Sequence, residues 1–248
     1  MSQSTARTFI TPHHIIYGPD ALAEASTLVA TLGTRALIVT DAMMAKLGNL
    51  ARVTNMLDDA GISYHVYDEV NSEPVDTMVA RGAELFQEHG CDFMIALGGG
   101  SPIDTMKAIA MVVSSGRDID SFLGENFSGS VCPMVAIPTT AGTGSEVTPS
   151  LLITDETTGV KYPLADYELL PKMSIVDADM MMNAPKGTDR GLRHRRVTHA
   201  LEAYASMMAT DYTDGLALRA LQMIFQYLPR AYDNGQTDVA AREKMANA

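Results

Sequence analysis

The predicted fold rests mainly on one stretch of the sequence, Phe93-Met94-Ile95-Ala96-Leu97-Gly98-Gly99-Gly100-Ser101-Pro102-Ile103-Asp104. Its first five residues form an apolar run typical of a strand covered on both faces. Three glycines and an amphipathic helical pattern follow. Glycines let the backbone approach a bulky anion, and a helix N-terminus presents free N–H groups to it. The stretch therefore predicts a strand, a turn and a helix that can bind a diphosphate; a tight turn without a ligand is the alternative.

Three residues indicate how this helix begins. Ser101 is a good N-cap, Pro102 fits the first helical position, and Asp104 stands where the acid of a capping box would. We therefore expect a helix over residues 102–115.

Outward from this stretch, short apolar runs alternate with helical patterns, which is the signature of a parallel α/β sheet. From Pro185 onward only helical patterns remain. The sequence predicts a parallel-sheet α/β dinucleotide-binding domain over residues 1–184, then an all-helical domain over 185–248 that we expect to be incomplete. The expected strands are 36–40, 93–97, 135–137 and 173–176, with a hairpin of 151–154 and 160–164; the expected helices are 20–32, 47–60, 75–89, 102–115, 200–208, 213–228 and 239–248.

Two further segments carry candidate binding residues. Asp41 comes directly after the expected strand 36–40. An acid there can accept hydrogen bonds from a ribose diol and repel a 2′-phosphate, although a helix N-cap is the alternative. The loop Pro138-Thr139-Thr140-Ala141-Gly142-Thr143-Gly144-Ser145-Glu146 is dense in hydroxyls and glycines. It could line a phosphate or nicotinamide pocket, or be an ordinary polar loop.

Composition excludes several classes of partner. The formal net charge of −12 argues against nucleic acid, which requires clustered Lys and Arg. No run of about 18 apolar residues indicates a membrane span. Two cysteines, Cys91 and Cys132, cannot form a disulfide framework, and residues 1–7 lack the apolar run of a secretory signal. We therefore expect a cytoplasmic protein.

Four stretches together resemble the iron-type (group III) alcohol dehydrogenases. They are residues 98–104, 138–146, 161–169 and Thr198-His199-Ala200-Leu201-Glu202-Ala203-Tyr204. Residues 161–169 look especially like the alcohol dehydrogenase part of bifunctional aldehyde–alcohol dehydrogenases. The resemblance implies that hydride passes between a small alcohol or aldehyde and NAD(H), while a divalent metal, Fe(II) or Zn(II), polarises the substrate oxygen. The resemblance is also compatible with a homo-oligomer.

The resemblance also implies roles for individual residues. The cofactor would lie between the two domains, with Asp41 at its adenosine ribose and Lys161 near its ribose and nicotinamide end. The residues implied at its diphosphate and along its flank are Gly98, Gly99, Gly100, Ser101, Asp104, Thr139, Thr140 and Thr143.

The metal site departs from the family pattern. The family holds its metal with one Asp and three His, and the first two come from D-x-x-x-H on a helix. Here His199 matches the histidine, but Arg195 stands where the Asp would be, and an arginine cannot ligate a metal. The other two histidines would follow Ala248, so we expect one ligand of four and a truncated helical domain.

The arginines near this position suggest an origin for the departure. Consider one set of codons that encodes Gly187 to His199. If one base is removed before the Thr188 codon and one is restored after the Arg196 codon, the same bases encode G-L-T-A-A-C-G-I-D-A-V-T-H. In that sequence an Asp stands four residues before the His. Our hypothesis is a pair of compensating frameshifts in the gene or its sequencing; a natural basic loop is the alternative. Arginines that are buried and unpaired in this segment would weaken folding.

Three interpretations of the whole chain stay open: part of an alcohol dehydrogenase active only in its full form, a catalytically dead nucleotide-binding protein, and an unstable fragment.

Overall fold

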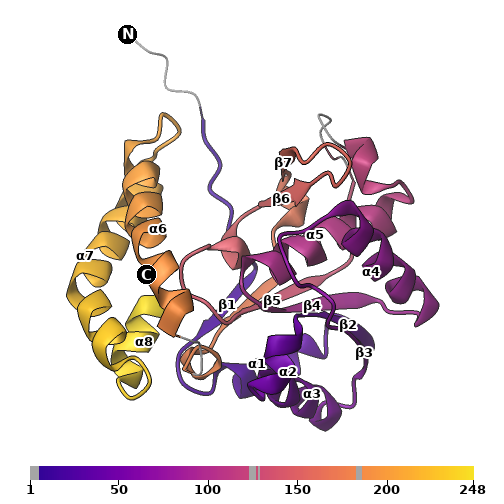
Figure 1. Cartoon of the computed structure of the whole chain (residues 1–248), viewed down its shortest axis with the longest axis horizontal. Coiled ribbons are helices and arrows are strands. Elements are labelled where there is room, and N and C mark those ends of the chain that lie inside the picture. Colours follow the sequence, from indigo (N-terminus) through magenta and orange to yellow (C-terminus); the bar gives the residue numbers. More distant parts are fainter. Residues whose placement is uncertain (1–5, 123–126, 128, 183–185) are drawn as a thin grey trace.

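The computed structural model describes residues 6–122, 127, 129–182 and 186–248, without the side chains of residues 186–194. An α/β part occupies most of the chain, and three helices follow it (Figure 1). No helix among the described residues is both long and apolar enough to cross a bilayer.

Six strands form one sheet in the order β1-β8-β5-β4-β2-β3, and every neighbouring pair is parallel. The expected strands in this sheet are confirmed to within about a residue at each end. Two strands, β1 and β3, were not expected. The strands are β1 (His14–Tyr17), β2 (Arg35–Val39), β3 (Ser63–Tyr67), β4 (Phe93–Gly98), β5 (Met134–Pro138) and β8 (Met173–Val176).

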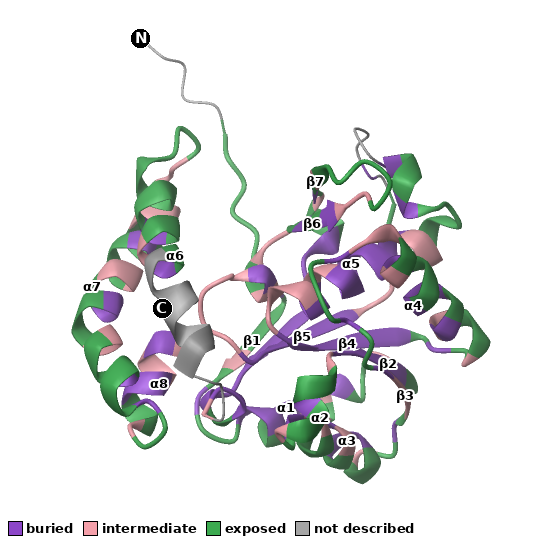
Figure 2. Cartoon of the chain, in the orientation of Figure 1, coloured by how far each residue is buried: buried purple, intermediate pink, exposed green. Residues whose placement is uncertain are grey.

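Helices cover both faces of this sheet, as the apolar strand runs predict. On β2, Leu37 and Val39 pack beneath α4 and α5, whereas Ala36 and Ile38 pack beneath α1 and α3. All four side chains are fully buried, and Figure 2 shows the central strands as the buried heart of the molecule. The helices are α1 (Ala21–Val29), α2 (Ala42–Lys46), α3 (Asn49–Asp59), α4 (Asp76–Glu88) and α5 (Gly100–Ser115).

The order of the strands places a topological switch point between β2 and β4. The chain passes from β2 outward to β3 at one edge, while β4 continues to β5 on the other side. Crossover helices leave in opposite directions at such a point, so a crevice opens at the carboxyl ends of the strands. Asp41 and the three glycines follow the two strands that flank this crevice.

The expected hairpin is confirmed. Strands β6 (Ser150–Thr154) and β7 (Lys161–Ala165) pair antiparallel with Leu152 opposite Pro163. The hairpin also touches the segment before α4 through a bridge between Val75 and Thr154.

Three helices follow the α/β part: α6 (Lys186–Ala205), α7 (Asp211–Asn234) and α8 (Val239–Ala246). They share a small core of their own, made of Ala200, Ile224, Ala231, Ala241 and Met245. Thr210 starts α7 with a capping box to Thr213. The expected domain boundary near Ala184 lies outside the described residues, and the division at 184/185 stays a prediction.

Candidate nucleotide site

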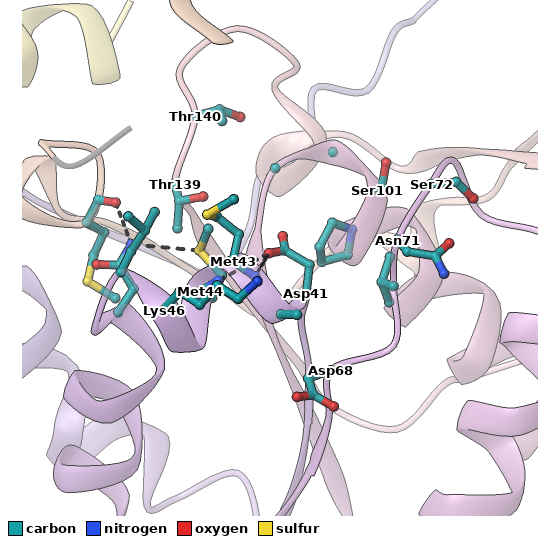
Figure 3. Close-up of a pocket in the computed structure, with 18 residues that line it drawn as sticks. Asp41, Met43, Met44, Lys46, Asp68, Asn71, Ser72, Ser101, Thr139 and Thr140 are labelled. Carbon is teal, nitrogen blue, oxygen red and sulfur yellow. Dashed lines mark hydrogen bonds between the residues drawn. The ribbon is translucent and has the colours of Figure 1, made fainter. Parts of the chain in front are cut away.

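A pocket of about 540 Å³ opens at the carboxyl ends of the central strands (Figure 3). Its size is in the range of small-molecule and cofactor sites, and its position is that of the switch point. It brings together six residues that the sequence predicted as cofactor contacts: Asp41, Gly99, Gly100, Ser101, Thr139 and Thr140.

The glycine turn has little room for side chains of its own, because other side chains lie against it. Gly98 has φ +151°, and a Cβ there would lie 2.6 Å from Pro102 Cγ, so a side chain is excluded. A Cβ on Gly99 would come within 3.2 Å of Thr140 Oγ1, and one on Gly100 within 3.1 Å of Thr143 Cγ2. Gly99 and Gly100 therefore let the 139–143 loop lie directly on the turn, whereas Gly98 leaves room for Pro102.

Helix α5 begins at the pocket with its first N–H groups uncapped by any side chain. Its N-cap is Gly99, in an extended conformation, and no side-chain capping bond is present. Free N–H groups and the helix dipole at such an end favour an anion. The local structure fits a diphosphate.

The expected cap of this helix is wrong. Helix α5 starts at Gly100, so Ser101 and Pro102 lie inside the first turn. Proline is tolerated there because first-turn N–H groups have no intrahelical acceptor. Asp104 does not form a capping box either: its Oδ2 accepts the Leu152 N–H of the hairpin at 3.3 Å. Asp104 is not among the residues that line the pocket.

Asp41 is the N-cap of α2 and also lines the pocket, and its predicted contact with the ribose stays a prediction. Its Oδ1 accepts the N–H groups of Met43 at 2.8 Å and Met44 at 3.2 Å, which makes it the N-cap of α2. The same residue lines the pocket, and Figure 3 shows these two bonds. The cap fixes the orientation of the carboxylate at the pocket wall.

Four of the predicted cofactor contacts lie outside the pocket lining: Gly98, Asp104, Thr143 and Lys161. Of these, Thr143 packs against Gly100. Lys161, on β7, forms an ion pair with Glu73. Its predicted place near the nicotinamide end stays a prediction.

Sequence reasoning missed five polar residues of the pocket: Lys46, Asn49, Asp68, Asn71 and Ser72. The last three follow β3, which was not expected to be a strand. Its alternation of Tyr64 and Val66 with His65 and Tyr67 was the available signal.

Comparison with known families covers most of the chain. Residues 12–178 match the family model described as iron-containing alcohol dehydrogenase. Residues 196–248 match the C-terminal model of the same family. The chain belongs to the iron-containing alcohol dehydrogenase family.

Relatives in this family are similar over nearly the whole chain. The NAD-dependent methanol dehydrogenase of Bacillus methanolicus is 39% identical over 242 residues, which is 97% of this chain and 63% of that protein. The bifunctional aldehyde-alcohol dehydrogenase of Escherichia coli K12 is 40% identical over 250 residues, 96% of this chain and 28% of that protein. The chain thus spans less than two thirds of the length of either relative.

Solved structures of the family share the fold. A 1,3-propanediol oxidoreductase superposes with a TM-score of 0.94 at 33% identity, covering 98% of this chain and 64% of that one. The sulfoacetaldehyde reductase of Bifidobacterium kashiwanohense, solved in complex with NAD+, has a TM-score of 0.91 at 28% identity, with coverages of 98% and 65%.

The described side chains do not form a ligand set for the iron that the family name implies. Within that part of the chain, no group of three or more His, Cys, Asp or Glu residues could hold a metal ion. His199 is exposed on α6, and Arg195, one turn earlier on the same helix, is exposed as well. The described residues therefore do not fit a metal centre, and His199 remains a lone candidate ligand.

Proposed function

We propose that this chain supplies the NAD-binding half of an alcohol dehydrogenase that passes hydride between an alcohol or aldehyde and NAD(H). The observation that carries this proposal is the pocket at the switch point, where the uncapped start of α5 and Asp41 face one cavity. Family membership and two NAD-linked relatives, the methanol dehydrogenase and the sulfoacetaldehyde reductase, support the choice of cofactor.

In this proposal the chain's own residues bind and orient the dinucleotide. Gly98 to Ser101 and the free N–H groups of α5 take the diphosphate, since the helix dipole favours its negative charge. Asp41 accepts hydrogen bonds from the adenosine ribose diol and repels a 2′-phosphate. Thr139, Thr140 and Thr143 flank the cofactor opposite the glycine turn. Lys161 would join its ribose and nicotinamide end after leaving Glu73.

The substrate end is proposed only as a class. Relatives act on methanol, on other alcohols and aldehydes, and on sulfoacetaldehyde by their names. Because the described residues do not fit a metal centre, no step is assigned to Fe(II) or Zn(II) here.

A second candidate is a nucleotide-binding protein without catalysis. Arg195, in place of a carboxylate one turn before His199, favours it, because a fixed positive charge repels a divalent cation.

One pair of measurements tests both candidates. Calorimetric titration with NAD tests the pocket, and alcohol oxidation with added Fe(II) or Zn(II) tests the metal chemistry. We expect NAD binding, with turnover far below the typical ~10 per second. Absence of NAD binding by the folded chain would reject the proposal. Fast metal-dependent turnover would instead reject the dead-protein candidate.

A further inference from the structure

Lys107 is a fully buried lysine on α5, two turns after the glycine turn. It does not line the pocket. Its Nζ donates to three backbone carbonyls, those of Ser145 at 2.8 Å, Thr148 at 2.7 Å and Ser150 at 2.8 Å. One side chain thus holds the segment that joins the 139–143 loop to the β6–β7 hairpin.

The carboxyl groups near Lys107 favour its protonated form. Burial lowers the pKa of Lys107 to about 8, while the carboxyl groups of Asp104 and Glu146 act in the opposite direction. Burial raises the pKa of both acids. A protonated amine has three N–H groups and a neutral amine has two, so three carbonyl acceptors select the ammonium form.

Asp104 adds a second link from the same helix face. It precedes Lys107 by three residues and accepts the Leu152 N–H. Together, the hydrogen bonds of Lys107 and Asp104 hold residues 145–152 against α5. The start of that same helix lines the pocket.

We propose that Lys107 is a positioning residue of the nucleotide site, because it fixes the far end of the loop whose threonines lie over Gly99 and Gly100. This inference rests on the proposed NAD binding. The loop has little freedom at its near end, where Thr139 N–H donates to Gly98 carbonyl at 2.9 Å. With both ends held on β4 and α5, the separation of Thr140 and Thr143 from the glycine turn is set before a ligand arrives, and preorganisation of this kind increases affinity.

A purely structural role for Lys107 makes a different forecast. Loss of a buried lysine would then lower the melting temperature and leave the affinity of the folded protein for NAD unchanged. A control with equal loss of stability is therefore needed. Met111 is also fully buried on α5, one turn later, and does not line the pocket. It shares an apolar core with Leu151, but no described hydrogen bond joins it to residues 145–152.

The test compares Lys107→Met with Met111→Ala in the full chain. Two quantities are measured well below both melting temperatures: the dissociation constant for NAD, and amide hydrogen exchange without ligand at Val147 and Leu152. We expect Lys107→Met to weaken NAD binding at least tenfold and to speed exchange at both amides, whereas Met111→Ala changes neither. Lys107→Gln, which keeps two donors, should fall between Lys107→Met and the unsubstituted chain, and it replaces Lys107→Met if that variant does not fold.

Equal NAD affinity in the lysine variant and the methionine control would overturn the inference. If the unsubstituted chain itself binds no NAD, the proposed function fails, and hydrogen exchange alone decides: unchanged exchange in Lys107→Met would overturn the positioning role as well.

Discussion

Arg196 on α6 donates from Nε to the Ala141 carbonyl at a distance of 2.5 Å. The arginine is buried, and the bond joins the helical part of the chain to the loop over the glycine turn. Arg196 belongs to the segment for which we infer a frameshift. Neither of the two arginines whose side chains are described is both buried and unpaired, since Arg196 is bonded and Arg195 is exposed. The other arginines of the segment lie outside the described side chains.

Replacement of Arg196 with alanine, the residue of the restored reading frame, should lower the free energy of unfolding. The variant loses a charge-assisted hydrogen bond and strands the Ala141 carbonyl, which costs roughly 1.5–3 kcal/mol. Urea unfolding measures the loss. Arg195→Ala, an exposed neighbour on the same helix, is the control and should change stability by less than about 0.5 kcal/mol. Equal effects of the two substitutions would show that the bond to Ala141 contributes nothing.

Arg195→Asp should create a weak metal site with His199. A carboxylate and an imidazole four residues apart lie on the same helix face, and the repelling charge is removed. At a Zn(II) concentration about tenfold above its dissociation constant, binding would add about 1.4 kcal/mol. A rise of a few degrees in the melting temperature is therefore expected. The unsubstituted chain and Arg195→Ala should show no rise. A similar rise in all three proteins would reveal a site elsewhere in the chain.

Gly100→Val should abolish most NAD binding. The Cβ would lie 3.1 Å from Thr143 Cγ2, and the added methyl groups would separate the loop from the start of α5. We expect at least a tenfold increase in the NAD dissociation constant, measured by calorimetry. Gly215→Ala on α7 is the matched control, because nothing lies within 4 Å of its Cβ. It should stabilise the chain by roughly 0.5–1 kcal/mol and leave NAD affinity unchanged.

Asp92→Asn should destabilise the chain at neutral pH and lose this effect in acid. Burial raises the pKa of Asp92, but hydrogen bonds from Thr34 and Arg35 outweigh it and hold the pKa below its usual value. A depressed carboxyl pKa contributes stability above the unfolded value of about 3.9, and this stability is lost as pH falls through the folded value. Because Asp92 is exposed, the loss at pH 7 should not exceed about 1 kcal/mol. Melting curves of both proteins from pH 7 to pH 2 measure it, and a gap that widens in acid would contradict the assignment.

The sequence predicted the central fold because buried parallel strands read as continuous apolar runs. Strand β4 and the glycines after it are the clearest case. It missed β3, an edge strand in which Ser63 is exposed and Tyr64 to Val66 are only partly covered, so their pattern is mixed. It misplaced the start of α5, since glycine tolerates both cap and helical geometry at positions 99 and 100.

The sequence predicted several residues that line the pocket, but not the contacts of Lys107 that hold the neighbouring loop. Asp41, the glycine turn and Thr139–Thr140 each follow a strand, so the shared edge of a parallel sheet brings them together. Lys107 gave no signal, because a lysine in an amphipathic helix is usually exposed. Its carbonyl partners come from a loop 38 to 43 residues away, and only the folded chain shows that contact.

We propose that this pocket binds NAD and that the Asp41 carboxylate selects against NADP. Calorimetry of the unsubstituted chain with NAD and NADP, beside Asp41→Asn, tests it most directly. Asparagine keeps the N-cap of α2 and removes only the charge. We expect NAD to bind at least tenfold more tightly than NADP, and the asparagine variant to narrow that ratio without a loss of melting temperature. Equal binding of NAD and NADP by the unsubstituted chain would contradict the account of Asp41, and no binding of either would contradict the assignment of the pocket.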